Sequence, residues 1–509
     1  VTKKKRRTFI RNISAFSGVM VILPEMVAGN SFSGKPAYKR SLASVTSYPE
    51  AQLAANKRIP LGWPAFPVAA KNLSPVYMKF NSMKDISEDF HFRLTAAIDI
   101  REELILETFL PESGETIASL DIKYAHPFQP FETPVENKWI PEIIRQGLGL
   151  RMIKGTQDAW FFKADSKHTD NLGLQPQLIS GTYPGSNVEL FKNLYSMNSF
   201  SPFGWMGGCV IDALLELSRK GDRKAKKMLE KQLACFLDDS KGIIFENPMT
   251  EPVDGRFNSI EDFLPFAAIA SLYPEHPSVQ MAVDYCLVRM KPDGLIASGD
   301  HITTEGCYTV AYPLAQIALI RNDRKLAEIA LNQLVHRIHY LSTNEAIFQR
   351  NDLGKGTGFK NWGRGITWYL LGMVKTINLI GNSAFADLPQ LEPVKTEFVR
   401  AMDWVYRFQD ENGMWCSFVD RHETLPDTTA TSGIAAAIAW GVHSKLLPET
   451  DIRKAEKALK NLQNYLTADG FLTHVSQINR GEEALQSNGY RVISQFAMGL
   501  MAQLKCKLS

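Results

Sequence analysis

The sequence predicts a mainly α-helical protein in which a ring of helical hairpins follows an N-terminal β-rich region. From about residue 203 onward, apolar residues recur at three- and four-residue steps, the period of an amphipathic helix. A short turn recurs in the same part of the chain at spacings near 50 residues, which indicates one repeated structural unit. Between residues 36 and 190, apolar and polar residues instead alternate in short segments bounded by Pro, Gly and Asn, which is the pattern of strands.

The composition is that of a globular protein and excludes several functional classes. The 509 residues are 45% apolar and 22% charged, and 57 Lys and Arg against 54 Asp and Glu give a net charge of +3. So small a charge argues against nucleic-acid binding, and the absence of an apolar run of about 20 residues argues against a membrane span. The six cysteines form no Cys-x-x-Cys pair, so we expect them to be buried as small apolar side chains.

The N-terminus has the features of an export signal. A basic stretch, residues 3–11, contains the pair Arg6-Arg7 and precedes a mostly apolar stretch, residues 13–27. We predict that residues 1–29 are a signal peptide of the twin-arginine type and that the protein is periplasmic or exported. The alternative is a basic, disordered tail. Residues 1–29 hold six basic residues and one acidic residue, so the rest of the chain is slightly acidic.

Residues 36–190 are predicted to form an accessory β-rich domain. The segments that alternate or are rich in β-branched and aromatic residues predict strands at 90–95, 104–109, 118–124 and 159–162. The stretch that begins at Ile140 favours a short helix.

Residues 200–509 are predicted to form the ring. The helices expected from apolar periodicity and caps lie at 204–219, 222–239, 259–272, 276–291, 305–321, 323–341, 364–381, 391–409, 430–445, 450–467 and 489–505. The repeated turns are at Gly242, Gly294, Ala346, Gly413 and Gly470. Five complete helix pairs and a closing helix fit a ring in which each pair packs against its neighbours, and a straight solenoid is the alternative.

Four stretches of this helical half resemble motifs of one family of enzymes. Residues 203–208 open the first helix, and residues 305–315 lead into Leu-Ala. Residues 361–368 carry a Trp-Gly-Arg-Gly sequence, and residues 427–432 carry an Asp-Thr-Thr-Ala-Thr sequence. In this order and within a helical repeat, they resemble the six-hairpin glycosidases with an (α/α)6 toroid. The likeness is greatest to the unsaturated uronyl and rhamnogalacturonyl hydrolases of glycoside hydrolase families 88 and 105.

The resemblance implies a catalytic pair of carboxyl groups. The family's acid/base Asp aligns with Glu305, and its second pocket Asp aligns with Glu261 or the adjacent Asp262. The Asn and Gly that follow the family's Arg-Gly are Ile366 and Thr367 here. These replacements leave open a related activity, such as cleavage of saturated glucuronides.

The chemistry of glycosidic cleavage supports the same residues. One carboxyl group must protonate the leaving oxygen, and another must activate water or attack the sugar. Glu305 and Glu261 or Asp262 begin different hairpins, and helix starts in a ring of hairpins converge at one end. We expect Glu305 to act as acid/base. The alternative for all three is a carboxylate that complements a helix dipole.

A uronic acid substrate also needs partners for its carboxylate and its ring. Arg364 is the leading candidate for the carboxylate, and a structural role tying loops to helix ends is the alternative. The further candidate binding residues are His301, His474, Arg491, Asp427 and the aromatic residues Trp205, Tyr308, Trp362, Trp368 and Trp415. Core packing is the alternative for the aromatic residues.

The sequence therefore predicts an enzyme without cofactor or metal. It contains no nucleotide-binding glycine motif, no Gly-x-Ser-x-Gly and no His-Glu-x-x-His. The expected partner is an oligosaccharide that carries a uronic acid, and no nucleic acid. Two alternatives stay open: a polysaccharide lyase on the same toroid, and a non-catalytic glycan-binding protein.

Overall fold

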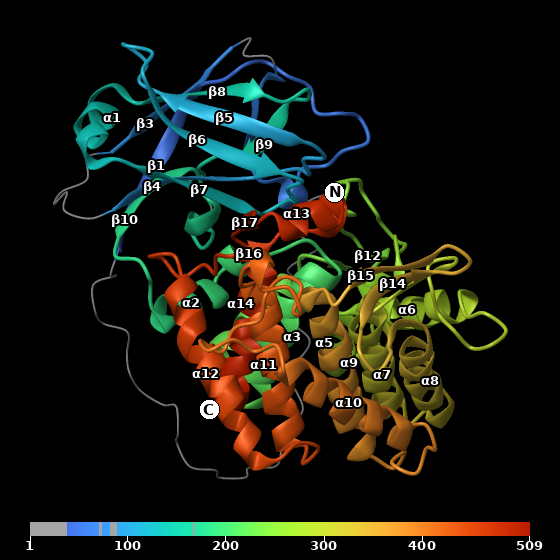
Figure 1. The fold of residues 1–509 in the computed structure, drawn as a ribbon. Coiled ribbons are helices and arrows are strands. Elements are labelled where there is room, and N and C mark those ends of the chain that lie inside the picture. The colour runs from blue at the N-terminus through green and yellow to red at the C-terminus, as the bar shows by residue number, and fades with distance from the viewer. Residues whose placement is uncertain (1–37, 71–73, 82–88, 166, 168) are drawn as a thin grey trace. The chain divides into compact units, whose positions relative to one another are not determined.

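Strands and helices are segregated along the chain, as the two sequence patterns indicate. The computed structural model describes residues 38–70, 74–81, 89–165, 167 and 169–509, and the predicted leader lies outside them. Strands dominate up to Gly181, and helices dominate after it (Figure 1). Within the described residues, no helix combines the length and the apolar character needed to cross a membrane.

The N-terminal part is built on one antiparallel sheet. Its eight described strands lie in the order β6-β5-β8-β3-β1-β10-β4-β7, and β2 and β9 form a separate two-stranded ribbon. The edge strands β6 and β7 also contact each other, so the sheet curls toward a barrel (Figure 1). The bounds are β1 Tyr38–Ser47, β2 Ala65–Val68, β3 Val76–Phe80, β4 Phe90–Thr95, β5 Glu103–Phe109, β6 Thr116–Lys123, β7 Pro130–Val135, β8 Leu148–Lys154, β9 Ala159–Phe162 and β10 Gln177–Gly181.

The N-terminal part contains the four predicted strands, three in the sheet and β9 in the ribbon, and several that the alternation pattern did not reveal. The segments at β4, β5, β6 and β9 were expected, and helix α1, Ile140–Gln146, occurs where a short helix was expected. Strand β10 was not, because all five of its residues are buried and it therefore lacks the alternation of a half-exposed strand.

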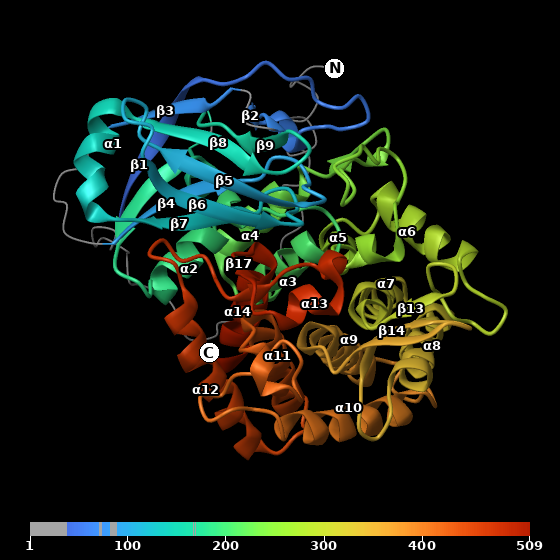
Figure 2. The same cartoon turned by 45° about the horizontal axis from the view of Figure 1, so that its top comes forward.

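The helical part is a closed ring. Among the described residues, six inner helices contact one another in the cycle α3-α5-α7-α9-α11-α14 and back to α3 (Figure 2). A straight solenoid is excluded, because the first and the last inner helices pack together. Their bounds are α3 Trp205–Arg219, α5 Phe266–Leu272, α7 Tyr312–Arg321, α9 Gly363–Gly381, α11 Thr428–His443 and α14 Gln495–Leu508.

An outer helix precedes each inner helix. The outer helices are α2 Asn187–Leu194, α4 Arg223–Leu233, α6 Pro277–Val288, α8 Arg324–Leu341, α10 Leu391–Tyr406 and α12 Ile452–Leu462. The described ring thus has six pairs, whereas the sequence predicted five pairs and a closing helix. The difference is α2, the first outer helix. It packs against the closing helix α14, which thereby gains an outer partner and forms the sixth pair. With only eight residues, α2 is too short for a clear helical period.

The inner helices approach one another closely at glycines. A Cβ atom at Gly372 of α9 would lie 2.2 Å from the backbone of Cys307, and one at Gly499 of α14 would lie 2.6 Å from the backbone of Cys209. Glycine is therefore required at these crossings, where no side chain fits between the helices.

The repeated turns connect each outer helix to the next inner helix. Gly242, Gly294, Gly413 and Gly470 all have positive φ, between 75° and 91°, a conformation that favours glycine. Each turn therefore reverses the chain at the end of the ring where the inner helices begin.

The last of these turns joins the sheet to the ring. Arg93 of β4 is fully buried, and its guanidinium donates to both carboxylate oxygens of Asp469 at 2.7 Å. It also pairs with Glu132 of β7 and lies 4.6 Å from the ring centroid of Phe471. Removing one partner of such a buried pair is strongly destabilising, so this contact fixes the sheet on the last hairpin.

Two insertions extend from the ring at the end where the inner helices begin. One is a small sheet of β13 His301–Thr303, β14 Phe348–Asp352 and β15 Gly356–Lys360. The other separates α12 from α14 and contains β16 Val475–Ser476, α13 Glu482–Ser487 and β17 Arg491–Val492 (Figure 1). Because of this insertion, the closing helix starts at Gln495 rather than at the predicted residue 489. The two-residue strands β11 Leu237–Asp238 and β12 Gly242–Ile243 flank the first repeated turn.

Candidate active site

The predicted site residues cluster at the N-terminal ends of the inner helices. Trp205 begins α3, and Trp362 and Asp427 immediately precede α9 and α11. Glu261 lies in a single 3-10 turn, Ile260–Phe263, before α5, and Glu305 lies just before a π-helical turn, Cys307–Ala311, that leads into α7. π-Helical turns are rare and frequent at functional sites, so this one marks the Glu305 region as unusual.

The backbone around Glu305 is held by a buried arginine. Arg337 of α8 is fully buried, and it donates to the carbonyl oxygens of Thr303 and Ile296 at 3.0 Å. Its guanidinium lies directly beneath Gly306, where a Cβ atom would come within 1.9 Å of Nη2. Gly306 is therefore required for this approach, and Arg337 fixes the turn that presents Glu305.

The carboxyl group of Glu305 accepts hydrogen bonds from a glutamine. The residue is 7% exposed, and Nε2 of Gln349 in β14 donates to its Oε1 at 3.0 Å and to its Oε2 at 2.9 Å. Burial raises the pKa of Glu305 above its ordinary value, and the Gln349 hydrogen bonds and the charge of Arg364 oppose that rise. The side chain is therefore held in one orientation but does not pair with a described cation.

Of the two neighbouring acids, Asp262 has a structural role. Its Oδ2 accepts from the backbone N–H groups of Asn258 at 2.7 Å and Ser259 at 2.9 Å, forming a capping box with Ser259. Burial raises the pKa of Asp262 to about 7, against these hydrogen bonds. The Asp262 side chain therefore caps the turn, and its hydrogen bonds to the backbone keep it from acting on a ligand.

Glu261 is the neighbour whose charge interacts with that of Glu305. Burial and the charge of Glu305 together raise the pKa of Glu261 to about 8. Neither Glu261 nor Glu305 forms an ion pair with a Lys, Arg or His in the part of the chain that the structure describes. The two carboxyl groups therefore share a site in which both cannot easily be ionised at once, the condition that separates an acid from a base.

Arg364 ties a loop and does not present its guanidinium to the site. It is 1% exposed, and its two terminal nitrogens donate to the carbonyl oxygens of Ser476 at 2.7 Å and Gln477 at 2.6 Å. It stacks on Trp362 at 4.4 Å from the ring centroid, and burial lowers its pKa to about 10. This is the loop-tying role that stood as the alternative to carboxylate binding.

Three of the predicted aromatic residues form a stack that leads inward from the mouth of the ring. Trp205 is partly exposed and meets Trp368 edge-on at 5.6 Å, and Trp368 stacks on Tyr308 at 6.1 Å. The hydroxyl of Tyr308 donates to Asp212 in the interior of the ring. Of the three, Trp205 is the one with surface available to a sugar, while Trp368 and Tyr308 support it from below.

The other two predicted tryptophans are core residues. Trp362 is 2% exposed and packs against Phe359 and Arg364. Trp415 is fully buried, and its indole N–H donates to the carbonyl oxygen of Val405 at 3.0 Å.

The remaining predicted residues hold loops together. Asp427 caps α11 through the N–H of Thr429 and accepts from the hydroxyl of Ser476 at 2.7 Å. Arg491 donates to the carbonyl oxygens of Thr424, Leu425 and Pro426.

Neither predicted histidine is free in the structure. His301 pairs with Asp352 across the β13–β14 strands, and His474 contacts Thr473 and the ring of Tyr465. The structure thus brings these residues to the mouth but gives them local partners.

Sequence reasoning missed several residues that shape the site. Only the tertiary structure reveals the roles of Gln349, Arg337 and Arg480. Each lies on an element far in sequence from the carboxyl group that it affects. A buried pair in the interior, Asp212 and Lys375, was missed for the same reason. Lys375 lies in the middle of an apolar helix. A lysine at such a position was the one sign in the sequence of a buried ion pair.

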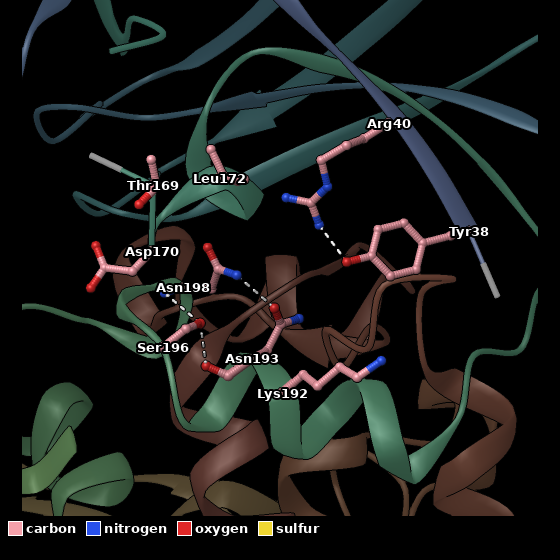
Figure 3. A pocket seen from close by; sticks show the side chains of 9 residues that line it. All are labelled: Tyr38, Arg40, Thr169, Asp170, Leu172, Lys192, Asn193, Ser196 and Asn198. Carbon is pink, nitrogen blue, oxygen red and sulfur yellow. Dashed lines mark hydrogen bonds between the residues drawn. The ribbon is translucent and has the colours of Figure 1, made fainter. Parts of the chain in front are cut away.

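A separate pocket lies between the sheet and α2 and contains none of the predicted residues (Figure 3). Its volume is about 210 Å³, below the usual size of a small-molecule site, which is about 300–1,000 Å³. Arg40 in its wall donates to the hydroxyl of Tyr38 at 2.7 Å and lies 3.5 Å from Asp469, and Lys192 pairs with Glu189. Its charged groups are thus already paired, and it is not the active-site candidate.

Comparison with known proteins identifies the fold of the ring. Residues 307–506, less than half of the chain, match the sequence profile of Glycosyl Hydrolase Family 88. The matched range begins just after Glu305, so it contains neither carboxyl of the pair. No curated protein sequence is significantly similar to the chain.

Solved structures share the fold at low sequence identity. A glycoside hydrolase of family 105 from C. acetobutylicum superposes with a TM-score of 0.54 at 15% identity, over 63% of this chain and 99% of that one. A possible member of family 105 from Salmonella enterica serovar Paratyphi A gives 0.52 at 14% identity, over 62% and 83%. A protein described as a polysaccharide lyase gives 0.50 at 16% identity, over 63% and 96%.

These matches confirm the resemblance to six-hairpin glycosidases of the family 88 and 105 type. They agree with the closed ring of helix pairs in the structure. The neighbours cover a little under two thirds of this chain.

Proposed function

We propose that this chain is a glycoside hydrolase that removes a terminal uronic acid, saturated or Δ4,5-unsaturated, from polysaccharide-derived oligosaccharides. Glu261 and Glu305 are its catalytic carboxyl pair. The observation that carries the proposal is the electrostatic interaction of the buried Glu305 with the partly buried Glu261, neither paired with a described cation, at the mouth of an (α/α)6 ring.

The surroundings of the two carboxyls suit them to different roles. The Gln349 hydrogen bonds favour the ionised form of Glu305 against the burial that raises its pKa, while burial and the charge of Glu305 raise the pKa of Glu261 to about 8. We therefore assign the shared proton of the pair to Glu261. Glu261 donates that proton to the leaving oxygen, and the Glu305 carboxylate activates water or attacks the sugar.

The same pair serves an unsaturated substrate. A protonated carboxyl delivers a proton to the C4=C5 double bond, and a carboxylate helps water add at C5. The residues needed are the same in this case, and the partly exposed Trp205 offers an aromatic face on which the sugar ring stacks.

The test is turnover of uronides by matched variants. Purified protein is incubated with aryl glycuronides of both anomers and with lyase-generated unsaturated disaccharides, and release of uronic acid is followed. Glu305→Gln is expected to lower kcat/KM by about 10²- to 10⁴-fold, the scale of one acid or base group. Glu345→Gln, an exposed glutamate in a repeated turn, is the control and should keep full activity. Full activity of Glu305→Gln contradicts the proposal.

The leaving group separates the two roles. Acid catalysis matters most for a poor leaving group, so Glu261→Gln should lose more activity on an alkyl uronide than on a dinitrophenyl uronide. Glu305→Gln should lose similar activity on both. Equal losses in Glu261→Gln would reassign the acid.

A polysaccharide lyase is a second candidate because one structural neighbour is described as such. A lyase needs a base at the site, and Tyr308, three residues after Glu305, is the tyrosine to consider. Burial and the charge of Asp212 hold the pKa of Tyr308 far above its ordinary value, and its hydroxyl points to Asp212. A gain of ultraviolet absorbance from new double bonds would favour the lyase. Loss of existing absorbance supports hydration, and tight binding without turnover would favour a glycan-binding protein.

A further inference from the structure

The insertion between α12 and α14 is anchored on three sides. Arg364 holds its first strand through the carbonyl oxygens of Ser476 and Gln477. The side chain of Gln477 donates to the carbonyl oxygen of Lys123 in the N-terminal sheet at 2.7 Å, and the hydroxyl of Tyr490 donates to that of Asp121 at 2.9 Å. The segment is therefore fixed against the sheet as well as the ring.

The third side is the small sheet that also carries Gln349. Arg350, the residue next to Gln349 in β14, pairs with Glu482 at 3.3 Å, and the N–H of Phe359 donates to Glu483 at 2.8 Å. The same strand thus contacts Glu305 through one residue and the insertion through the next. This connection links the turn Asn479–Gly481, which directly precedes Glu482, to the strand that holds the Glu305 carboxyl.

Arg480 is the charged residue of that turn. The groups whose charges act on it are Arg101, Glu261, Asp99 and Glu482. It forms no hydrogen bond or ion pair with any residue that the structure describes. Its charge therefore acts on Glu261, one member of the carboxyl pair, while its donors are not taken up by described protein groups.

Its neighbour Arg101, from the connection between β4 and β5, is committed. Arg101 donates to Oδ2 of Asp99 at 2.7 Å and to the carbonyl oxygen of Pro248 at 2.6 Å. Of the charges acting on Arg480, that of Arg101 is the strongest, and it is repulsive. An anion near these two guanidiniums relieves that repulsion, and a planar carboxylate can take two parallel hydrogen bonds from Arg480.

The other arginines around the site are engaged. Arg364, Arg491 and Arg337 donate to backbone carbonyls, and Arg350 pairs with Glu482. Arg480 differs from all four because its side chain is exposed and its donors face no described protein acceptor, so that they are open to a ligand.

We infer that Arg480 is the specificity residue that binds the carboxylate of the substrate sugar beside Glu261, with Arg101 of the N-terminal sheet region adding its positive charge. The inference rests on the proposed function and names the residue by which a uronic acid is distinguished from a neutral sugar. It also makes the insertion of the last hairpin and the N-terminal part of the chain components of the substrate site.

The test compares an acid with its neutral analogue. The kcat and KM of Arg480→Gln, Arg480→Lys and wild type are measured on a uronide that wild type cleaves and on its uncharged methyl ester. Arg480→Gln is expected to raise KM for the uronide by about ten- to a hundredfold, the loss of charge-assisted hydrogen bonds, and to leave the ester nearly unchanged. Arg480→Lys should recover part of the loss. Arg453→Gln, an exposed residue of α12, is the matched control.

The outcomes separate this inference from the proposed function. An equal loss on uronide and ester, or no loss on either, overturns the role of Arg480 while leaving the hydrolase intact. If wild type turns over no uronide, calorimetric binding of a uronic acid disaccharide decides. If wild type binds the disaccharide and Arg480→Gln does not, the role of Arg480 in binding the carboxylate is supported and the hydrolase activity is rejected. If wild type does not bind the disaccharide, both proposals are overturned.

Discussion

Two groups of buried acids lie in the same ring, and they are compensated in opposite ways. In the interior, Asp212 of α3 pairs with Lys375 at 2.6 Å and accepts from the hydroxyls of Tyr308 and Tyr312. One turn further along α3, Glu216 lies among several cations. At the mouth, the charges of Glu261 and Glu305 interact, and neither carboxyl forms an ion pair with a described cation.

The difference shows in the direction of the pKa shifts. Burial opposes ionisation of Glu216, but Lys375, Lys507 and Arg219 outweigh it and lower the pKa. Burial and the charge of Glu305 both raise the pKa of Glu261, to about 8. A carboxyl group out of contact with water thus keeps a permanent charge where cations pair with it and an exchangeable proton where none does. The interior group stabilises the ring, and the mouth group is suited to chemistry.

The largest expected effect is on the interior pair. Lys375→Met leaves the Asp212 carboxylate buried without its cation and should lower the free energy of unfolding by about 3–5 kcal/mol. Chemical denaturation measures this loss. The double variant Asp212→Asn/Lys375→Met should recover part of it, because no unpaired charge remains. If Lys375→Met were as stable as wild type, the interior group would not be structural.

Replacing Glu261 is expected to raise the free energy of unfolding, by less than the Lys375 substitution lowers it. The folded protein keeps the Glu261 proton to about pH 8, whereas the unfolded chain releases it near the ordinary value of 4.5, so stability falls as pH rises between these values. Glu261→Gln removes that penalty. The variant should match wild type near pH 4 and gain on the order of 2–4 kcal/mol above pH 8.

Denaturation of both proteins from pH 4 to 9 measures this slope. Glu345→Gln serves again as the exposed control and should follow wild type throughout. Parallel curves for Glu261→Gln and wild type would mean that Glu261 is ionised in the folded state, and the contrast with the interior would fail.

The smallest effect is expected at the exposed rim. His301 and Asp352 pair on the surface of the small sheet with side chains 41% and 37% exposed. Exposed pairs contribute about 0–1 kcal/mol, so His301→Ala should change stability by less than about 1 kcal/mol and kcat/KM by about twofold at most. A larger loss of activity with unchanged stability would return His301 to the site, where the sequence had placed it.

Particular residues show how far local patterns reach. The apolar period located the inner helices α3, α9 and α11 to within two residues at each start, because one helix face is buried along the whole length. The positive-φ turns at Gly242 and Gly470 were located because glycine reports a local backbone requirement. The short helix α2 and the fully buried strand β10 were missed because neither carries a period.

The candidate site divides in the same way. Motifs located Glu305 and narrowed its partner to Glu261 or Asp262, but adjacent residues point in different directions and sequence could not choose. The capping box decided, since it commits Asp262 to Asn258 and Ser259. Arg364 was the favoured carboxylate ligand, and the carbonyl oxygens of Ser476 and Gln477, more than a hundred residues away, take up its donors instead.

The sequence by itself determined the helical repeat, the β-rich first part and the acidic residues at the helix starts, because periodicity, turn glycines and caps are properties of neighbouring residues. Only the tertiary structure decided which acidic residues pair with a cation and which do not. That outcome depends on Lys375, Gln349 and Arg480, which are brought to the acids from distant elements. Charge compensation is set by distance in space, and distance in sequence does not report it.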